Sequence, residues 1–258
     1  MDLRDKVSII TGGASGIGAA SARAFARAGA KVVVADRDMA GAQNVADEIG
    51  GLAVACDVAR TADIQALVAA AERAYGPVDV FFSNAGIGTG GDPFETPLEL
   101  WQQQWEVNVM AHVHAVRAVL PGMLERRAGY LIHTASMAGI LTTHGNLVYA
   151  VTKHAVVGLA EWLSVTYHER GVRTSLLAPL GVRTPMLDEG SAWARLAAGP
   201  IKSAEEVADL VVEGVATERF LILSDPIAQT WMDHKAKDLE RWLRGMRRLQ
   251  AEIERASG

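Results

Sequence analysis

The sequence predicts an α/β fold built on a parallel sheet that helices cover on both faces. Short runs rich in β-branched residues alternate with longer alanine-rich segments along most of the 258 residues. These short runs are continuously apolar rather than alternating, as expected for strands buried on both faces of a sheet. No proline-, glycine- and serine-rich linker and no internal repeat interrupts the alternation. These observations predict one domain, residues 1–258, with a Rossmann-type doubly wound parallel sheet of about seven strands.

The expected strands are runs dominated by valine, isoleucine, leucine and phenylalanine, which suit the pleated, buried surface of a sheet. In chain order they cover residues 7–10, 31–35, 52–56, 78–83, 130–133, 173–177 and 220–223. The alanine-rich segments predict helices, because alanine has the highest helix propensity. These helices cover residues 19–28, 39–49, 62–75, 98–127, 149–170 and 204–216. We expect the fourth helix to break near Pro121-Gly122, since proline removes a backbone donor.

Two segments fall outside this alternation. Residues 185–202 form an irregular insertion with two prolines and two glycines. Residues 226–258 form a tail whose apolar side chains recur at helical spacing. These side chains are Met232, Leu239, Trp242, Leu243, Met246 and Leu249. Basic residues accompany the stripe, so a membrane-surface helix is one interpretation, but acidic residues dilute the charge. We expect the tail to pack on a neighbouring subunit or on the protein's own core.

The composition narrows the classes of function. Half of the residues are hydrophobic, and the formal net charge of -5 argues against a nucleic-acid-binding protein, which usually carries a basic patch. Cys56 is the one cysteine, so no intrachain disulfide can form. The first residues lack the apolar core of a signal peptide, and no apolar run reaches the roughly 18 residues of a membrane span. We therefore expect a cytoplasmic protein that does not associate with a membrane. We also expect no metal site, because the seven histidines do not show the spacing of metal ligands.

A glycine-rich loop, Thr11-Gly12-Gly13-Ala14-Ser15-Gly16-Ile17-Gly18, joins the first strand to the first helix. Glycines let the backbone approach a pyrophosphate closely, and the helix N-terminus offers unpaired N–H groups. Asp36 ends the second strand, where a carboxylate bonds the adenosine ribose hydroxyls and repels a 2′-phosphate. NAD is therefore favoured over NADP, although Arg37 offers a guanidinium with which a 2′-phosphate would pair.

Tyr149 and Lys153 lie four residues apart on an expected helix and so share one face. A tyrosine pKa near 10 is poorly suited to base chemistry at neutral pH, and a nearby ammonium favours the phenolate. Lowering that pKa by about 3 units requires roughly 4 kcal/mol, which a partly desolvated positive charge helped by a cationic nicotinamide ring can supply. The pair is therefore a candidate acid/base.

Together these motifs resemble the classical short-chain dehydrogenase/reductase family. The resemblance covers about residues 5–225, and its motifs occur in the family's order. The motifs are Thr11 to Gly18, Asp57-Val58, Asn84-Ala85-Gly86, Asn108, Ser136 and Tyr149-Ala150-Val151-Thr152-Lys153. Ser136 precedes Tyr149 by 13 residues, a spacing common in the family.

The resemblance implies a role for each motif. Tyr149 would exchange a proton with the substrate oxygen, Lys153 would lower the tyrosine pKa and bond the nicotinamide ribose, and Ser136 would hold the substrate oxygen. Asn108 would bend its helix and position a water in a proton relay. Asp57 and Val58 would meet the adenine, and Asn84-Ala85-Gly86 would brace the sheet beside the cofactor. The implied catalytic residues are Asn108, Ser136, Tyr149 and Lys153. The implied cofactor contacts are Gly12, Ser15, Gly16, Ile17, Gly18, Asp36, Arg37, Asp57, Val58, Asn84, Ala85, Gly86, Tyr149, Lys153, Pro179, Val182 and Thr184.

One motif departs from the family pattern. The family shows Pro-Gly-x-Val-x-Thr after the sixth strand, whereas this chain has Pro179-Leu180-Gly181-Val182-Arg183-Thr184. Val182 and Thr184 keep their places, so contacts to the carboxamide are expected to persist. Leu180 carries a Cβ, so a left-handed backbone there would be costly, and its side chain is expected to shape the nicotinamide pocket.

Residues 185–202 match the family's substrate-covering loop, whose apolar side chains would exclude water from a bound substrate. His144 lies between Ser136 and Tyr149, where the family places substrate-facing residues. The expected substrate contacts are Met137, His144, Met186 and Trp193. They predict a lipophilic, cyclic or aromatic alcohol or ketone.

The resemblance also implies a homodimer or homotetramer, with the helices at 98–127 and 149–170 in its main interface. The interpretation is a dinucleotide-binding catalytic domain for NAD-linked oxidation of a secondary alcohol, or the reverse reduction. One alternative is a non-catalytic dinucleotide-binding regulator, which could dispense with an acid/base. Another is a lyase or epimerase that uses the bound cofactor transiently, and net production of NADH separates it from a dehydrogenase.

Overall fold

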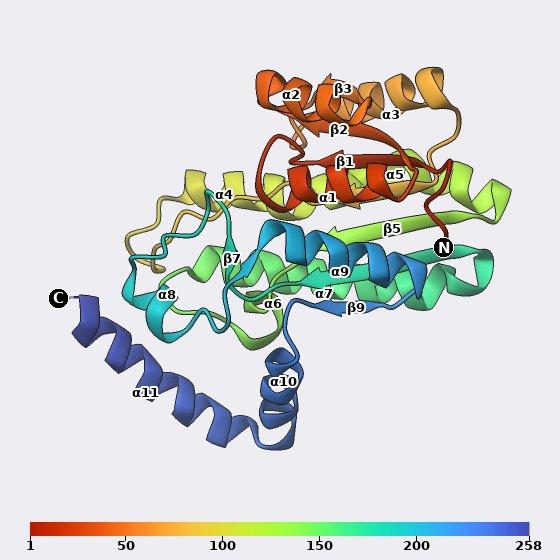
Figure 1. The fold of residues 1–258 in the computed structure, drawn as a ribbon. Helices are drawn as coiled ribbons and strands as arrows, with labels where there is room; N and C mark the ends of the chain where they lie inside the picture. The colour runs from red at the N-terminus through yellow and green to blue at the C-terminus, as the bar shows by residue number, and fades with distance from the viewer. Residues whose placement is uncertain (258) are drawn as a thin grey trace.

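The structure is a computed structural model that describes residues 1–257. Its centre is a seven-stranded sheet in the order β3-β2-β1-β4-β5-β6-β9 (Figure 1), and all neighbouring strands are parallel. The strands are β1 (Val7–Thr11), β2 (Lys31–Asp36), β3 (Leu52–Ala55), β4 (Val80–Ser83), β5 (Gly129–Thr134), β6 (Val172–Ala178) and β9 (Leu221–Leu223). The predicted seven-stranded, doubly wound sheet is confirmed.

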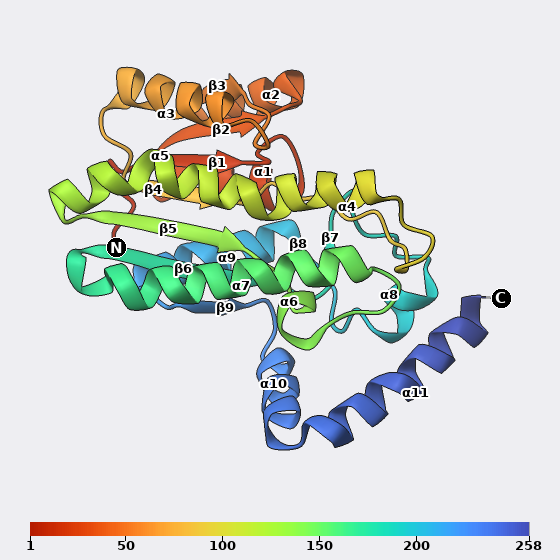
Figure 2. The same cartoon turned by 180° about the vertical axis from the view of Figure 1, so that it is seen from behind.

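Helices cover both faces of the sheet, as Figures 1 and 2 show. One face packs against α1 (Gly16–Arg27), α2 (Met39–Ile49) and α9 (Ala204–Ala216), and the other against α3 (Thr61–Tyr75), α5 (Ala111–Arg126) and α7 (Leu147–Tyr167). Successive residues of a strand point to opposite faces. Ile10 and Phe82 therefore belong to the first core, and Ile9 and Phe81 to the second. Because both cores are apolar, the strands are continuous hydrophobic runs.

The strand order reverses between β1 and β4. From β1 the chain moves outward to β2 and β3, and then crosses back to β4 on the other side of β1. Sheets of this kind bind ligands in the crevice at the carboxyl ends of the strands, where the order reverses. The glycine-rich loop follows β1 at this edge, and Asn84 follows β4.

The predicted helix break near Pro121 is wrong. Residues 98–127 form α4 (Leu98–Trp105), a π-helical turn η1 (Glu106–Met110) and α5, and Pro121 lies inside α5. Leu120 and Met123 beside it are buried in the second core, and this packing offsets the hydrogen bond that proline cannot donate. The irregularity is instead the π-helical turn, which contains Asn108.

Most of the remaining elements lie at the carboxyl edge of the sheet. They are α6 (Ala138–Leu141), β7 (Val182–Arg183), α8 (Ala192–Leu196), β8 (Lys202–Ser203), α10 (Ile227–Lys237) and α11 (Leu239–Ser257). η2 (His168–Arg170) instead joins α7 to the amino end of β6. β7 and β8 pair with each other and bracket α8 within the irregular insertion.

The C-terminal tail packs on its own chain, one of the two arrangements expected from its apolar stripe. α10 lies against α6, and α11 lies against α8 and α10. Both helices extend from the sheet at the lower side of Figure 1. Ile253 is the one buried residue of α11. No helix within residues 1–257 has the length and apolar character needed to cross a membrane.

Candidate active site

The glycine-rich loop turns tightly from β1 into α1. Gly12 has a φ of +67°, and a Cβ there would lie 2.9 Å from the Cα of Ala85. A Cβ on Gly18 would lie 2.0 Å from the carbonyl oxygen of Gly12, so only glycine lets α1 approach the loop. Ser15 forms no side-chain cap on α1, and the first turn has no acidic residue. The first N–H groups of α1, from Gly16 onward, therefore suit the pyrophosphate of a dinucleotide.

Asp36 ends β2 beside this loop and fixes its shape. Its Oδ2 accepts a hydrogen bond from the N–H of Ala14 at 3.1 Å, and its Oδ1 accepts one from the N–H of Asp38 at 3.0 Å. A carboxylate has about four acceptor sites, so it can also bind the ribose hydroxyls expected here. The bond to the loop is a structural role that the sequence did not predict. Arg37 beside it is exposed.

The expected adenine contacts follow β3. Val58 is 7% exposed, whereas Asp57 is exposed and its Oδ1 accepts a hydrogen bond from the N–H of Ala59 at 3.1 Å. Both residues lie at the same carboxyl edge of the sheet as Asp36, because β3 is the parallel neighbour of β2.

Asn84 joins three strands at the reversal of strand order. Its Nδ2 donates to the carbonyl of Thr11 at 3.1 Å, its backbone N–H donates to Thr11 Oγ1 at 3.0 Å, and its Oδ1 accepts from Thr134 Oγ1 at 3.2 Å. A Cβ on Gly86 would lie 3.4 Å from the Nζ of Lys153, so the chain passes close to this lysine. The bracing role implied for Asn84 agrees with these bonds.

Asn108 joins the π-helical turn to the loop after β4 and to α7. Its Oδ1 accepts from the N–H of Ile87 at 2.8 Å, and its Nδ2 donates to the Ile87 carbonyl at 2.9 Å and to Thr152 Oγ1 at 3.1 Å. The amide is completely buried. π-Helical turns are rare and are frequent at functional sites. Asn108 thus lies in a local irregularity of its helix, and its bending and water-relay roles stay predictions.

Tyr149 and Lys153 lie on α7 next to Ser136. Asn146 caps this helix, since its Oδ1 accepts from the N–H of Tyr149 at 3.3 Å. Lys153 is 2% exposed, and its Nζ donates to the carbonyl of Thr134 at 2.8 Å. That Nζ lies 5.5 Å from the centre of the Tyr149 ring. Ser136 follows β5, and its hydroxyl is close enough to the Tyr149 phenol to lower the pKa of that phenol, while its Oγ accepts a hydrogen bond from the N–H of Ala138 at 3.1 Å.

Burial governs protonation of both side chains. Desolvation raises the pKa of Tyr149, and the nearby Ser136 hydroxyl partly opposes that rise. Burial also lowers the pKa of Lys153 to about 8. The acidic phenol was expected from the lysine helped by a cationic nicotinamide ring, and without that ring burial raises the pKa of Tyr149. Further positive charge is needed beside the ring, and the cation of an oxidised nicotinamide is of the right sign.

The segment after β6 accommodates Leu180 without a left-handed backbone. Neither Leu180 nor Gly181 has a positive φ. The N–H of Leu180 donates to Ser224 Oγ at 2.9 Å, and its side chain packs in a cluster with Met137 and Trp231. The expected cost of a Cβ at this position is therefore absent, and Leu180 shapes the wall of the cavity described next.

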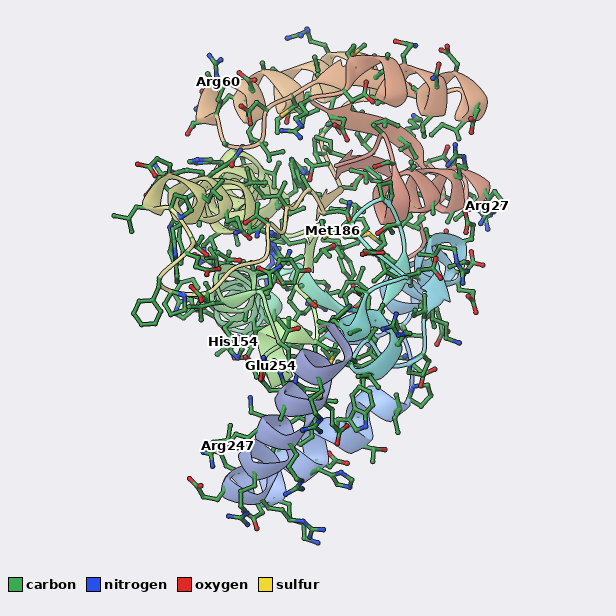
Figure 3. The ribbon with its side chains drawn as sticks, turned by 90° about the vertical axis from the view of Figure 1, so that its left-hand side faces the viewer. Arg27, Arg60, His154, Met186, Arg247 and Glu254 are labelled. Carbon is green, nitrogen blue, oxygen red and sulfur yellow. The ribbon has the colours of Figure 1, made fainter. Side chains whose placement is uncertain are left out.

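A cavity of about 1190 Å³ opens beside Tyr149. Ligand pockets are typically about 300–1,000 Å³, so this one has room for the reactive half of a dinucleotide and a substrate. Of the expected cofactor contacts, Ile17, Tyr149, Pro179, Val182 and Thr184 line it. All four expected substrate contacts, Met137, His144, Met186 and Trp193, line it as well. Met186, labelled in Figure 3, is 54% exposed.

The tail contributes part of the cavity that sequence reasoning missed. We call residues 231–249 of α10 and α11 the C-terminal wall. Its lining members are Trp231, His234, Lys237, Asp238, Arg241, Trp242, Gly245, Met246, Arg248 and Leu249. His144 meets α11 directly, because its Nδ1 lies 2.6 Å from the Oε1 of Gln250. The apolar stripe of the tail was the available signal, but spacing alone does not identify the surface that it covers.

Comparison with known proteins decides the family. The family model described as short chain dehydrogenase matches residues 6–195, which include every candidate catalytic side chain. The chain belongs to the short-chain dehydrogenase family. It is similar to 1-deoxy-11-beta-hydroxypentalenate dehydrogenase of Streptomyces exfoliatus, with 39% identity over 250 residues that cover 93% of this chain and 90% of that protein.

Two solved structures of related proteins contain a nicotinamide dinucleotide. A short-chain dehydrogenase/reductase from Burkholderia phymatum in complex with NAD superposes with a TM-score of 0.86 and 33% identity, covering 93% of this chain and 96% of that chain. A 3-ketoacyl-(acyl-carrier-protein) reductase from Brucella melitensis complexed with NADH superposes with a TM-score of 0.80 and 30% identity, covering 86% of this chain and 96% of that chain. This short-chain dehydrogenase is therefore a nicotinamide-dependent oxidoreductase that acts on CH–OH groups.

Proposed function

We propose that this short-chain dehydrogenase transfers a hydride between NAD and a lipophilic secondary alcohol or the corresponding ketone. The arrangement of Tyr149 carries the proposal. Its phenol interacts with the Ser136 hydroxyl, lies near the buried ammonium of Lys153 and lines a large cavity. We propose Met137, His144, Met186 and Trp193 as substrate contacts, because they line the same cavity. Three of the four are apolar or aromatic, which favours a lipophilic substrate.

Each of these residues has a separate role in the proposed oxidation of an alcohol. When bound, the nicotinamide ring accepts the hydride from the alcohol carbon. Tyr149 Oη accepts the hydroxyl proton, and Ser136 Oγ donates a hydrogen bond to the same substrate oxygen. The Lys153 ammonium, held by the carbonyl of Thr134, stabilises the phenolate. The alcohol thus loses one proton and one hydride and leaves as a ketone, and in reduction Tyr149 returns the proton.

A substrate screen tests this function. We expect cyclic secondary alcohols to reduce NAD, followed as NADH absorbance, with the matching ketones oxidising NADH and NADP tested in parallel. Best activity on small hydrophilic polyols would contradict the lipophilic assignment. Conversion of a substrate to its isomer without net NADH would replace the dehydrogenase by an epimerase.

The preference for NAD rests on Asp36. Replacing Asp36 with alanine removes the charge that would repel a 2′-phosphate and also two hydrogen bonds that shape the loop. We expect the Kd for NAD to rise about tenfold and the ratio of NADP to NAD activity to increase. Calorimetric titration and steady-state kinetics measure the two effects. Asp47→Ala, which removes an exposed carboxylate of α2, is the control, and an unchanged cofactor ratio in Asp36→Ala would contradict the assignment.

We also propose that the protein is a homodimer or homotetramer with α4, α5 and α7 at its main interface. Leu98 on α4 is 80% exposed, and Trp162 and Val165 on α7 are 58% and 86% exposed. A second copy of the same face would bury these apolar side chains.

A charge placed in this face should dissociate the assembly. Val165→Glu would place a carboxylate in an apolar interface, so we expect its sedimentation coefficient at micromolar concentration to fall to that of a monomer. Leu239→Glu adds the same charge at an exposed position of α11 and should leave the assembly intact. A wild-type protein that sediments as a monomer would exclude the oligomer.

A further inference from the structure

The C-terminal wall brings cationic groups to the substrate cavity. It belongs to α10 and α11, which follow the last strand and lie beyond residues 6–195, the part that matches the family model. α11 packs against α8, which belongs to the loop expected to cover the substrate. The catalytic side chains and this wall thus border one cavity from distant parts of the sequence.

One face of α11 meets the cavity, and its residues recur at helical spacing. Trp242, Met246 and Leu249 supply its apolar part, while Arg241 and Arg248 lie two turns apart on the same face. Two further arginines of the helix, Arg244 and Arg247, are exposed and do not line the cavity. Arg247 is labelled in Figure 3. The helix therefore offers a matched internal comparison between arginines at the cavity and arginines away from it.

The charges at this end of the cavity favour an anion. Lys237, Arg241 and Arg248 line it, and none of them forms an ion pair within residues 1–257. The two carboxylates that also line it are held by backbone groups. Asp238 accepts the N–H of Arg241 at 2.9 Å, and Asp188 accepts the N–H of Gly190 at 3.0 Å. Asp238 lies at the N-terminus of α11, where the positive end of the helix dipole partly offsets its charge.

The contact between α11 and the rest of the protein leaves polar atoms without a partner. Nε1 of Trp242 and Nε2 of His144 are buried and form no hydrogen bond within residues 1–257. Such atoms oppose burial, because they have lost water without gaining a protein partner. The protein alone therefore holds this contact weakly, and a ligand bound to both α11 and the cavity would strengthen it.

We propose that Arg241 and Arg248 bind a carboxylate of the substrate, so that the preferred substrate is a lipophilic secondary alcohol or ketone that carries a carboxylate. Guanidinium groups suit this role because they bind carboxylates with two parallel hydrogen bonds. The apolar part of the α11 face holds the carbon skeleton between the carboxylate and the reacting carbon at Tyr149. This inference rests on the proposed function, since it names the substrate class of the same site.

Matched pairs of compounds test the inference. The probes are secondary alcohols of one, two and three fused rings that carry a short carboxylate side chain, each compared with its methyl ester. We expect kcat/KM with NAD to favour the best acid over its ester by about tenfold or more. Arg241→Ala/Arg248→Ala should lower this ratio to about one, while Arg244→Ala/Arg247→Ala, with the same change in net charge, should preserve it. Equal use of acids and esters by the wild-type protein, or an unchanged ratio in the first double variant, would overturn the proposal.

Binding measurements separate this inference from the proposed function. Quenching of tryptophan fluorescence in the presence of NAD reports binding without turnover, because Trp193, Trp231 and Trp242 line the cavity. Acids that bind more tightly than esters through Arg241 and Arg248, yet are not oxidised, support the carboxylate site and contradict the proposed function. Oxidation that does not depend on these arginines supports the function and overturns the carboxylate site. If each acid and its ester bind with equal affinity, the carboxylate site is overturned, whether or not the compounds are oxidised.

Discussion

Replacing Tyr149 with phenylalanine is expected to lower kcat/KM for alcohol oxidation by roughly 10³-fold while the protein stays folded and binds NAD. The substitution removes the atom that we propose as the acceptor of the hydroxyl proton and leaves the ring in place on α7. The loss should fall mainly on kcat, because the phenol bonds most strongly to the oxygen whose charge changes during reaction. Stopped-flow and steady-state kinetics measure the loss, and calorimetry measures NAD affinity.

The matched control for this prediction is Tyr167→Phe, the same change at the other end of α7. Tyr167 packs edge-on against Trp162 and lies outside the cavity lining, so it should keep full activity. The pH profile adds a second test. Because burial raises the pKa of Tyr149, oxidation by the wild-type protein should increase toward alkaline pH. A Tyr149→Phe enzyme with more than about a tenth of wild-type activity would assign the proton transfer to another group.

Replacing Lys153 with methionine is expected to abolish most activity and yet stabilise the fold at pH 7. Activity should fall by roughly a hundredfold or more, because the phenolate loses its stabilising charge. Burial lowers the pKa of Lys153 from the ordinary 10.5 to about 8, so burying this ammonium costs about 3 kcal/mol at neutral pH. Losing its hydrogen bond to Thr134 costs about 1 kcal/mol. We therefore expect a net gain of about 2 kcal/mol in the free energy of unfolding, an order-of-magnitude figure.

The sign of this effect can be checked by changing the pH. Between about 8 and 10.5 the unfolded lysine holds a proton that the folded lysine has released, so the stability of the wild-type protein rises with pH in that window. The advantage of Lys153→Met should be largest below pH 8 and should shrink as the pH approaches 10.5. Chemical denaturation at several pH values measures it. Lys31→Met, at an exposed position of β2, should show no such gain, and a Lys153→Met protein less stable than wild type at pH 7 would refute the prediction.

The sheet could be predicted because each strand carries its own signal. Ile9 and Ile10 face opposite cores, so both must be apolar, and the continuous hydrophobic runs that result differ from helical periodicity. The glycine loop and the spacing of Tyr149 and Lys153 were equally local signals. The edge of the sheet at which the cofactor is expected could also be predicted, because parallel strands bring all their carboxyl ends to one side of the sheet.

Other features depended on contacts between distant segments. Proline propensity predicted a break at Pro121, but burial of its neighbours in the second core kept α5 continuous. The acidity expected of the Tyr149 phenol allowed for a partly desolvated lysine and a nicotinamide cation, but burial of the phenol itself, which raises its pKa, is a property of the folded site. The tail gave a clear apolar stripe, but nothing in its spacing indicated that α11 would contact His144 or border the cavity.

The position of α10 and α11 after the final strand makes the segment exchangeable. The sheet ends at Leu223, and Ile253 is the one buried residue of α11, so we expect the folding of the α/β body to depend little on most side chains of this helix. We therefore expect that another segment joined at this end would leave the proposed proton and hydride chemistry unchanged. Chimeras in which α10 and α11 are exchanged just after β9 should consequently transfer substrate selectivity from one family member to another.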